Sequence, residues 1–245
     1  MNHRAWILTL DILELMLRGK IAVLRNRYIK AVAKGYEKNQ AIPSSERMKH
    51  EAAVNNAIAT QYKKVIPIFR NKIRHDMKHC GYAVEKKAIS NYDAIIAEWI
   101  STEALRKAKM IAATDSQDIL DAIEAGMLEG STLPEISKAI RGKAGLTPMR
   151  ASVIARTETH NASTYASVES VREVEVETGV KFMKQWIATN DTRTRDRHSE
   201  MIGSEPIPMD EKFYVGGEYL DRAGDPSGSP ENVINCRCQM IFSEQ

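Results

Sequence analysis

Two of the three cysteines in this 245-residue chain stand one residue apart near its end, in the stretch NVINCRC at residues 232–238. Paired thiols can bind a soft metal ion, form a disulfide, carry out redox chemistry, or pack as small apolar side chains. We predict a strand over residues 232–242, in which alternate side chains point to opposite faces. The apolar face then carries Ile234, Cys236, Cys238, Met240 and Phe242, and the polar face carries Asn235, Arg237 and Gln239.

This alternation favours simple burial of the two thiols over a metal site, and a metal site over redox or catalytic use. Same-face neighbours on a strand have Cα atoms about 6.5–7 Å apart, at or beyond the range that a disulfide spans. A structural zinc site needs four ligands, and this half of the chain offers only His160 and His198 besides the thiols. We therefore expect no cofactor, with zinc as the alternative.

Polar residues with directional hydrogen-bonding groups lie upstream of the cysteines, and two spacings bring them together. Arg156 and His160 are four residues apart and share a helical face, and Arg195 and His198 are three apart. We predict a structural network that fastens a long helix, a turn and the last strand together. Its members are Arg156, Glu158, His160, Asn161, Asp191, Arg193, Arg195, His198, Asn235 and Arg237.

The alternative for these residues is an active site. Glu158 or His160 would serve as the base, and an arginine would stabilise an oxyanion or phosphate. The sequence has no nucleophile elbow, phosphate-binding loop or HExxH motif to support this. We therefore expect a protein that is not an enzyme and has no catalytic residues.

Helices dominate the elements that must position these residues. Apolar residues recur at three- and four-residue steps through residues 1–145, which is typical of amphipathic helices. Pro67 predicts a break or kink between helices at 46–66 and 68–90. Further helices are expected over 91–112, 115–130 and 131–145.

After these helices the pattern changes from helical to mixed. Thr147 as cap and Pro148 as first residue predict a long helix over 148–178, and Gly179 ends it. A strand at 181–188 should lead into a turn and a short helix within 190–203, capped by Asp191 or Thr192. A hairpin at 212–220, turning at Gly216-Gly217, and a loop precede the last strand. The fold class is therefore α+β, with a mostly helical N-terminal region and a small α+β domain that holds a long helix and a short antiparallel sheet.

The charge is distributed unevenly along the chain. The net charge is only +3, but residues 1–90 carry +11 and residues 91–245 carry −8. The basic part is either a solvated helical face or a surface for phosphate or an acidic protein. The candidate contacts with DNA or a partner protein are Lys20, Arg25, Arg27 and Lys30.

Composition excludes several classes of protein. With 43% hydrophobic and 27% charged residues, the chain is expected to be soluble and globular. No apolar run is long enough for a transmembrane helix, and the N-terminal segment has the pattern of an amphipathic helix, not of a secretory signal. Three cysteines do not make a disulfide framework, so a reducing compartment is expected.

The ordered set of motifs in the C-terminal half resembles a known family. The stretch IARTETHNA is followed by W-x-A-x-x-D-x-R-T-R-x-x-H-x-x-M-x-G, which runs from Trp186 to Gly203, and by the terminal NCRC. Upstream, Gly126, Gly130, Glu135 and Ile136 fit the same pattern. Over roughly residues 90–245 the chain resembles the phage head morphogenesis family, the minor head proteins similar to phage Mu protein F and phage SPP1 gp7.

The resemblance implies a virion protein of a tailed phage or prophage. Such proteins associate with the portal and the procapsid and assist head assembly, DNA packaging or DNA ejection. Some relatives carry a Cys-x-x-Cys before the final Cys-x-Cys, which suggests a metal site. Here Arg195 and His198 occupy the matching positions, which leaves a mixed site of His198, Cys236 and Cys238.

We therefore expect three parts in the chain. Residues 1–90 form a basic helical region that docks to the portal or the capsid, 91–145 a helical connector, and 146–245 the head-morphogenesis domain. The expected partners are the portal or major capsid protein, with double-stranded DNA as a further one, and no membrane segment. The expected location is the head interior or portal vertex, and the host cytoplasm during assembly. The alternatives are a protein that escorts phage DNA, and a hydrolase or transferase that uses Glu158, His160 and His198.

Overall fold

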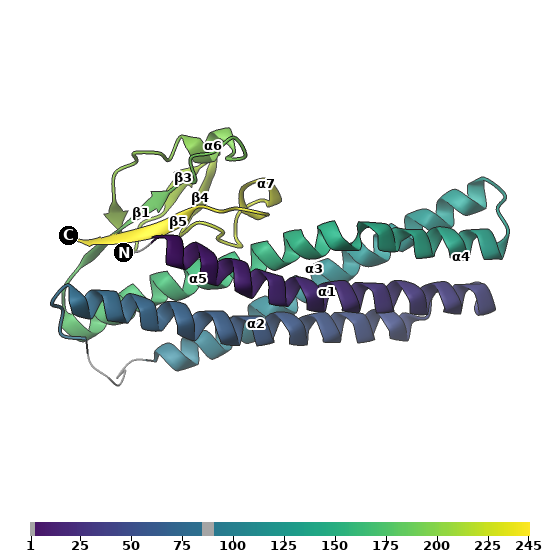
Figure 1. The fold of residues 1–245 in the computed structure, drawn as a ribbon, viewed down its shortest axis with the longest axis horizontal. Coiled ribbons are helices and arrows are strands. Elements are labelled where there is room, and N and C mark those ends of the chain that lie inside the picture. Colours follow the sequence, from purple (N-terminus) through teal and green to yellow (C-terminus); the bar gives the residue numbers. More distant parts are fainter. Residues whose placement is uncertain (1–2, 85–90) are drawn as a thin grey trace. The chain divides into compact units, whose positions relative to one another are not determined.

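The structure, a computed structural model, describes residues 3–84 and 91–245, with side chains from residue 8 onward. Its fold is mostly helical (Figure 1). This confirms the predicted fold class. The four long helices are α1 (His3–Asn39), α2 (Ser44–His79), α3 (Tyr92–Leu128) and α5 (Thr147–Thr178). Shorter elements are α4 (Leu133–Gly142), a 3-10 turn (Lys143–Leu146), α6 (Asp196–Ser199) and α7 (Pro230–Val233). The strands are β1 (Phe182–Ile187), β2 (Ile207–Pro208), β3 (Phe213–Val215), β4 (Glu218–Leu220) and β5 (Gln239–Glu244).

Two helices are longer than the sequence predicted. A break or kink was expected at Pro67, and the break is wrong, because α2 continues through this residue. Pro67 is exposed, whereas Ile66 and Phe69 on either side of it are buried, so packing holds both turns in one helix. The separate helices expected at 91–112 and 115–130 form the single helix α3, since no glycine or proline divides them. The end of the helix predicted over 68–90 falls partly on residues 85–90, which lie outside the described residues.

The chain divides into two compact units. Unit 1 holds Met1–Leu13, Tyr62–Glu98 and Arg156–Gln245, and unit 2 holds Glu14–Gln61 and Trp99–Ala155. The three parts predicted at 1–90, 91–145 and 146–245 stay a prediction, and the two compact units interleave stretches of these parts. The physical reason is that helices of 32 to 37 residues are long enough for different stretches of one helix to join different units.

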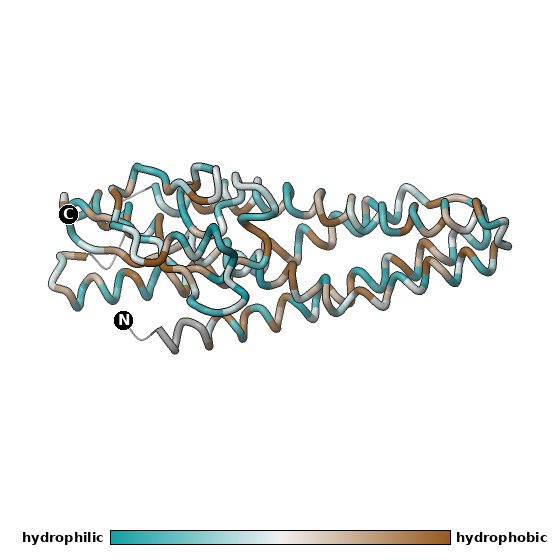
Figure 2. Tube along the Cα trace, turned by 90° about the horizontal axis from the view of Figure 1, so that it is seen from above, coloured by the Kyte–Doolittle hydropathy of each residue, from teal (hydrophilic) through white to brown (hydrophobic). Residues whose placement is uncertain are grey.

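Unit 2 is a helical unit with an aliphatic core. Ile29, Ile119 and Ile140 are among its fully buried residues. Figure 2 shows apolar and polar residues alternating along the long helices, as expected where one face is buried. In the last turn of α3, just before the turn into α4, a Cβ on Gly126 would lie only 2.6 Å from a side-chain carbon of Ile136. Gly126 therefore permits close packing at this turn.

A buried ionic cluster lies inside unit 2, and it corrects one sequence prediction. Arg25 was a candidate contact for DNA or a partner, but it is only 1% exposed. Its guanidinium donates to Asp115 at 2.8 Å, to Asp118 at 2.9 Å and to Thr147 at 2.8 Å. The exposed candidates on α1 are Lys20, Arg27 and Lys30.

Unit 1 contains the small sheet. The strands are antiparallel in the order β2-β1-β5, and β3 pairs with β4 in a separate hairpin. The hairpin turns at Gly216 and Gly217 as predicted, both with positive φ. Helix α5 matches the predicted helix 148–178, although Thr147 is its first residue and not its cap.

The last strand is shorter than predicted. Residues 230–233 form α7, and β5 begins only at Gln239. Asn235 has φ of 60°, a left-handed conformation that interrupts an extended chain. As a result, Ile234 is 42% exposed and does not share the buried face with Cys236 and Cys238. Alternation of burial holds only from Cys236 onward.

Among the described helices, none has an apolar stretch long enough to span a lipid bilayer.

Candidate metal centre

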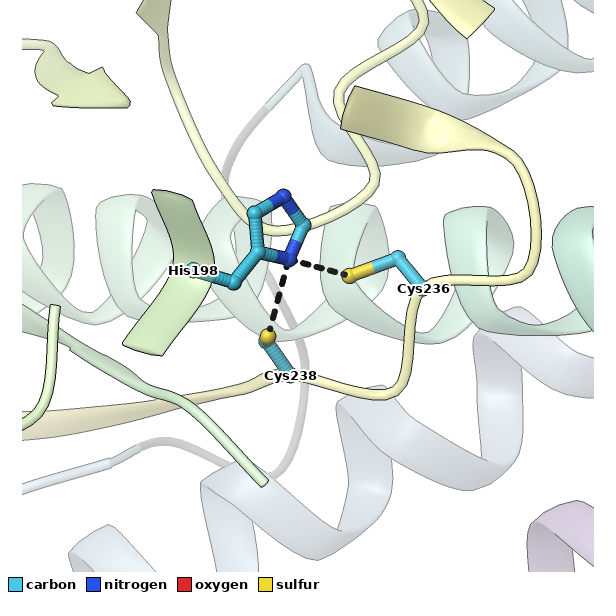
Figure 3. A group of neighbouring side chains, drawn as sticks. All are labelled: His198, Cys236 and Cys238. Carbon is cyan, nitrogen blue, oxygen red and sulfur yellow. Dashed lines mark hydrogen bonds between the residues drawn. The ribbon is translucent and has the colours of Figure 1, made fainter. Parts of the chain in front are cut away.

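Two segments of unit 1 bring a histidine and two thiols together. His198 lies in α6, and Cys236 and Cys238 lie in the segment between α7 and β5 (Figure 3). The Nδ1 atom of His198 is 3.4 Å from the sulfur of Cys238 and 3.8 Å from the sulfur of Cys236. All three side chains are 2% exposed. Their donor atoms lie within 4.8 Å of one another, so they could hold one metal ion.

Aromatic packing holds the imidazole in place. The ring of Trp186 on β1 meets that of His198 edge-to-face, with centroids 5.5 Å apart, and Phe213 meets Trp186 from another side at 5.7 Å. The other ring nitrogen of His198, Nε2, is buried without a hydrogen-bond partner in the described part of the chain. Of the two ring nitrogens of His198, Nδ1 is therefore the one with polar contacts, and these are with the two thiols.

Hydrogen bonds from two directions hold the backbone of the cysteine segment, residues 234–238. From α5, Thr157 Oγ1 accepts the backbone N–H of Asn235 at 2.9 Å, and His160 Nε2 donates to the Cys238 carbonyl at 2.6 Å. From the turn after β1, Thr189 Oγ1 donates to the Arg237 carbonyl at 2.9 Å, and Arg195 donates to the Ile234 carbonyl. These bonds fix where both sulfurs point.

Burial decides the protonation of His160. Desolvation lowers the pKa of His160, so its ring is neutral near pH 7 and donates through Nε2. The backbone at Gly224 lies close to the Nδ1 side of this ring. A Cβ added there would lie 2.6 Å from His160 Nδ1, and Gly224 has φ of +72°. Glycine is therefore favoured at position 224 both by the left-handed backbone and by the lack of space for a Cβ beside the His160 ring.

The two thiols differ in acidity. The pKa of Cys238 is lowered because Cys236 donates a hydrogen bond to it and because His198 lies beside it, which together outweigh its burial. The pKa of Cys236 is raised by the same hydrogen bond and by its own burial. One thiolate is therefore favoured in the pair, and thiolates are the form in which cysteine binds metals.

Asp191 and Arg237 form an ion pair beside the centre. The two terminal guanidinium nitrogens of Arg237, Nη1 and Nη2, donate to the two carboxylate oxygens of Asp191 at 2.5 and 2.7 Å. These bonds hold the pKa of Asp191 well below its usual range. Asp191 also accepts the backbone N–H of Arg193 at 2.9 Å, which closes a turn. It does not cap the short helix as predicted, because α6 begins five residues later and Arg195 precedes it.

The residues of the predicted polar network form several hydrogen bonds and ion pairs in place of one continuous network. Arg156 donates to the Asn235 side chain at 3.0 Å, and Arg237 pairs with Asp191. His198 faces the thiols instead of an arginine. Two other members contact residues that the sequence did not suggest. Glu158 accepts from the hydroxyl of Tyr62, and Asn161 accepts from Arg222 at 2.7 Å.

The three residues of the enzyme alternative each contact a different partner. Glu158, His160 and His198 are 4%, 3% and 2% exposed. Glu158 binds Tyr62, His160 binds the Cys238 backbone, and His198 faces the two sulfurs. Of these three, only His198 lines the small pocket at the cysteine segment.

The donor set fits a zinc ion. With Zn–S bonds of about 2.3 Å and Zn–N bonds of about 2.05 Å, a tetrahedral site places nitrogen and sulfur about 3.6 Å apart. The observed separations of 3.4 and 3.8 Å lie on either side of this value. Thiolate and imidazole are also the ligand types that zinc prefers.

Comparison with known proteins gives a family and two relatives. Residues 117–241, half of the chain, match the family model described as phage Mu protein F like protein. The chain is 31% identical over 129 residues to NAD(+)–arginine ADP-ribosyltransferase EFV of Enterococcus faecalis, a match that covers 51% of this chain and 25% of that protein. It is 29% identical over 125 residues to minor head protein GP7 of Bacillus phage SPP1, covering 51% of this chain and 40% of that protein. The chain thus spans well under half the length of either relative, and no solved structure matches it significantly.

Proposed function

This chain belongs to the phage Mu protein F like family, as its sequence motifs predicted, and from that premise we propose that it is a non-enzymatic minor head protein of a tailed bacteriophage or prophage. The observation that carries the proposal is the family match over residues 117–241, which includes every residue of the candidate metal centre. The relative in phage SPP1, a minor head protein by name, supports the same assignment.

We further propose that the protein binds the portal or the major capsid protein and assists head morphogenesis, DNA packaging or DNA ejection. It would assemble in the host cytoplasm and reside in the head interior or at the portal vertex. The exposed cations of α1, Lys20, Arg27 and Lys30, would contact an acidic partner surface.

Co-purification tests the proposal. A tagged chain is expressed during phage assembly, and heads are isolated at the scaffold stage and after maturation. We expect the chain in few copies per head, and its loss from heads that lack the portal would identify the portal as its partner. Retention on heads without the portal would identify the capsid protein instead. A chain absent from heads at every stage would contradict the proposal.

Escort of phage DNA is the second candidate, and the net charge of +11 on residues 1–90 favours it. Binding of double-stranded DNA would weaken steeply with salt, because cations that neutralise phosphates release counterions. Changing Lys20, Arg27 and Lys30 to glutamine would reduce the salt slope by about three. If the unmodified chain binds no DNA even at low salt, this candidate fails.

That the chain is not an enzyme is part of the proposal. It is supported by the burial of Glu158 and His160 and by the engagement of each with another residue. The relative named as an ADP-ribosyltransferase matches over only a quarter of its length. Its activity is therefore not carried over to this chain.

A further inference from the structure

Hydrogen bonding alone does not account for the contacts of His198. Its Nδ1 atom has either one proton or one lone pair, so it can make one good hydrogen bond. Two sulfurs nevertheless face it, at 3.4 and 3.8 Å. A single ion between the three atoms would satisfy all of them at once. The buried Nε2 atom has no hydrogen-bond partner among the described residues, so no competing hydrogen bond at Nε2 orients the ring.

We propose that His198, Cys236 and Cys238 bind one Zn²⁺ ion as three protein ligands, and that the fourth coordination position takes an oxyanion from outside the chain. Among the described residues, no other histidine, cysteine or carboxylate joins the group. Structural zinc sites use four protein ligands, whereas a site with three keeps an open position. This proposal concerns the isolated chain and does not depend on the proposed role in the phage head.

The charges around the centre favour an anionic fourth ligand. His198 and both cysteines line a small pocket together with Arg193, Arg195 and Arg237. Two thiolates would neutralise the zinc ion. Asp191 offsets one guanidinium, since it pairs with Arg237 and lies 3.7 Å from Arg193. Positive charge therefore remains at the pocket, and arginine is well suited to binding oxyanions.

Metal content of the purified full chain tests the ligand set. We expect one zinc per chain after dialysis against a weak chelator. Cys236→Ser, Cys238→Ser and His198→Asn should each fall below about a tenth of one equivalent, because each removes a ligand. Cys80→Ser is the matched control, since Cys80 is exposed and outside the group, and it should keep one equivalent. A wild-type chain without zinc that also fails to bind it on addition would overturn the proposal.

Thiol protection covers the case in which a ligand variant does not fold. In the Cys80→Ser background, the only remaining cysteines are Cys236 and Cys238. We expect zinc to slow their reaction with a thiol reagent by at least about tenfold relative to the chelator-treated chain. Equal rates with and without zinc would refute binding at these thiols.

The open position is tested with cobalt in place of zinc. The visible spectrum of the Co²⁺-loaded chain should show thiolate coordination and should change on addition of inorganic phosphate, with acetate as a second oxyanion. Arg193→Gln should bind cobalt normally but require several-fold more phosphate for the same change, because Arg193 lies in the pocket but outside the ligand set. A spectrum that neither anion alters would refute the exchangeable fourth ligand.

Discussion

At the scale of single residues, Gly224 and His160 together fix the position of Cys238. His160 donates from Nε2 to the Cys238 carbonyl, and Gly224 lies close to Nδ1, the other nitrogen of the same ring. We predict that Gly224→Ala destabilises the protein by about 3 kcal/mol, as the left-handed φ costs about 1 kcal/mol and overpacking against the ring adds about 2 kcal/mol. Urea unfolding followed by circular dichroism measures this.

Gly203 provides the matched control for this change. It has φ of +77°, close to that of Gly224, but a Cβ added there would meet nothing within 4 Å. Gly203→Ala should therefore cost only the conformational term, about 1 kcal/mol. Equal losses for the two variants would show that contact with His160 contributes nothing.

A substitution at Thr157 tests the hydrogen bond from α5 to the cysteine segment with little change in side-chain volume. Thr157→Val removes the acceptor of the Asn235 N–H and should cost about 1–3 kcal/mol in unfolding free energy. If zinc binds as proposed, zinc affinity should also fall by about tenfold or more, as is typical when groups that orient ligands are lost. Competition with a chromophoric chelator measures the affinity.

Thr60→Val is the control, because Thr60 is exposed and its hydroxyl donates to a carbonyl within its own helix. This variant should change neither the unfolding free energy nor the zinc affinity.

At the scale of elements, periodicity predicted the helical segments, although α2 and α3 were each expected as two helices, and aromatic and bulky residues predicted the strand β1. The helix at 148–178 and the hairpin at Gly216-Gly217 were predicted nearly as observed, because their signals are local. The interruption at Asn235 was missed, because alternation of apolar residues continues past it and nothing in neighbouring residues marks a left-handed asparagine.

The candidate site was predictable in composition but not in geometry. His198, Cys236 and Cys238 were identified as a set through the family motif, whereas their alternation along the chain had favoured simple packing. Partners separated by many residues had no local signal. Tyr62 is 96 residues from Glu158, and Arg222 is 61 residues from Asn161. The roles of Thr157 and Thr189 became visible only once the backbone positions were known.

The helices of unit 2 are joined by a buried ionic cluster that should respond to acid. Burial alone would raise the pKa of Asp115, but hydrogen bonds from His50 and Arg25 outweigh it and lower that pKa. A lowered carboxyl pKa in the folded state stabilises the protein above the unfolded value of about 3.9, and this contribution is lost as the pH falls through the folded pKa. Wild-type stability should therefore fall below about pH 4 in part through Asp115.

Asp115→Asn tests this contribution. It removes the buried negative charge that pairs with Arg25, which is itself 1% exposed, and we expect a loss of about 3–5 kcal/mol at pH 7. The difference from wild type should shrink as the pH falls below about 4, because Asp115 is then protonated in the unfolded wild-type chain and, at still lower pH, in the folded one. Asp118→Asn is the control, since Asp118 is 23% exposed and should cost clearly less. A difference that is independent of pH would show that the charge of Asp115 is not responsible.

At the scale of the whole molecule, the positive charge of the N-terminal part should determine how the protein meets its partner. Residues 1–90 carry +11 against −8 in the rest, and Lys20, Arg27 and Lys30 lie exposed on α1. If α1 docks to an acidic protein surface, changing these three residues to glutamine should weaken binding to isolated heads by about tenfold at low salt, since each exposed pair contributes up to about 1 kcal/mol. The difference should largely vanish near 1 M salt, where the screening length is about 3 Å. Lys63, Lys64 and Lys109, which are also exposed, serve as the control set for the same loss of charge. A similar loss of binding in both triple variants would mean that net charge, and not the position of the cations on α1, governs association.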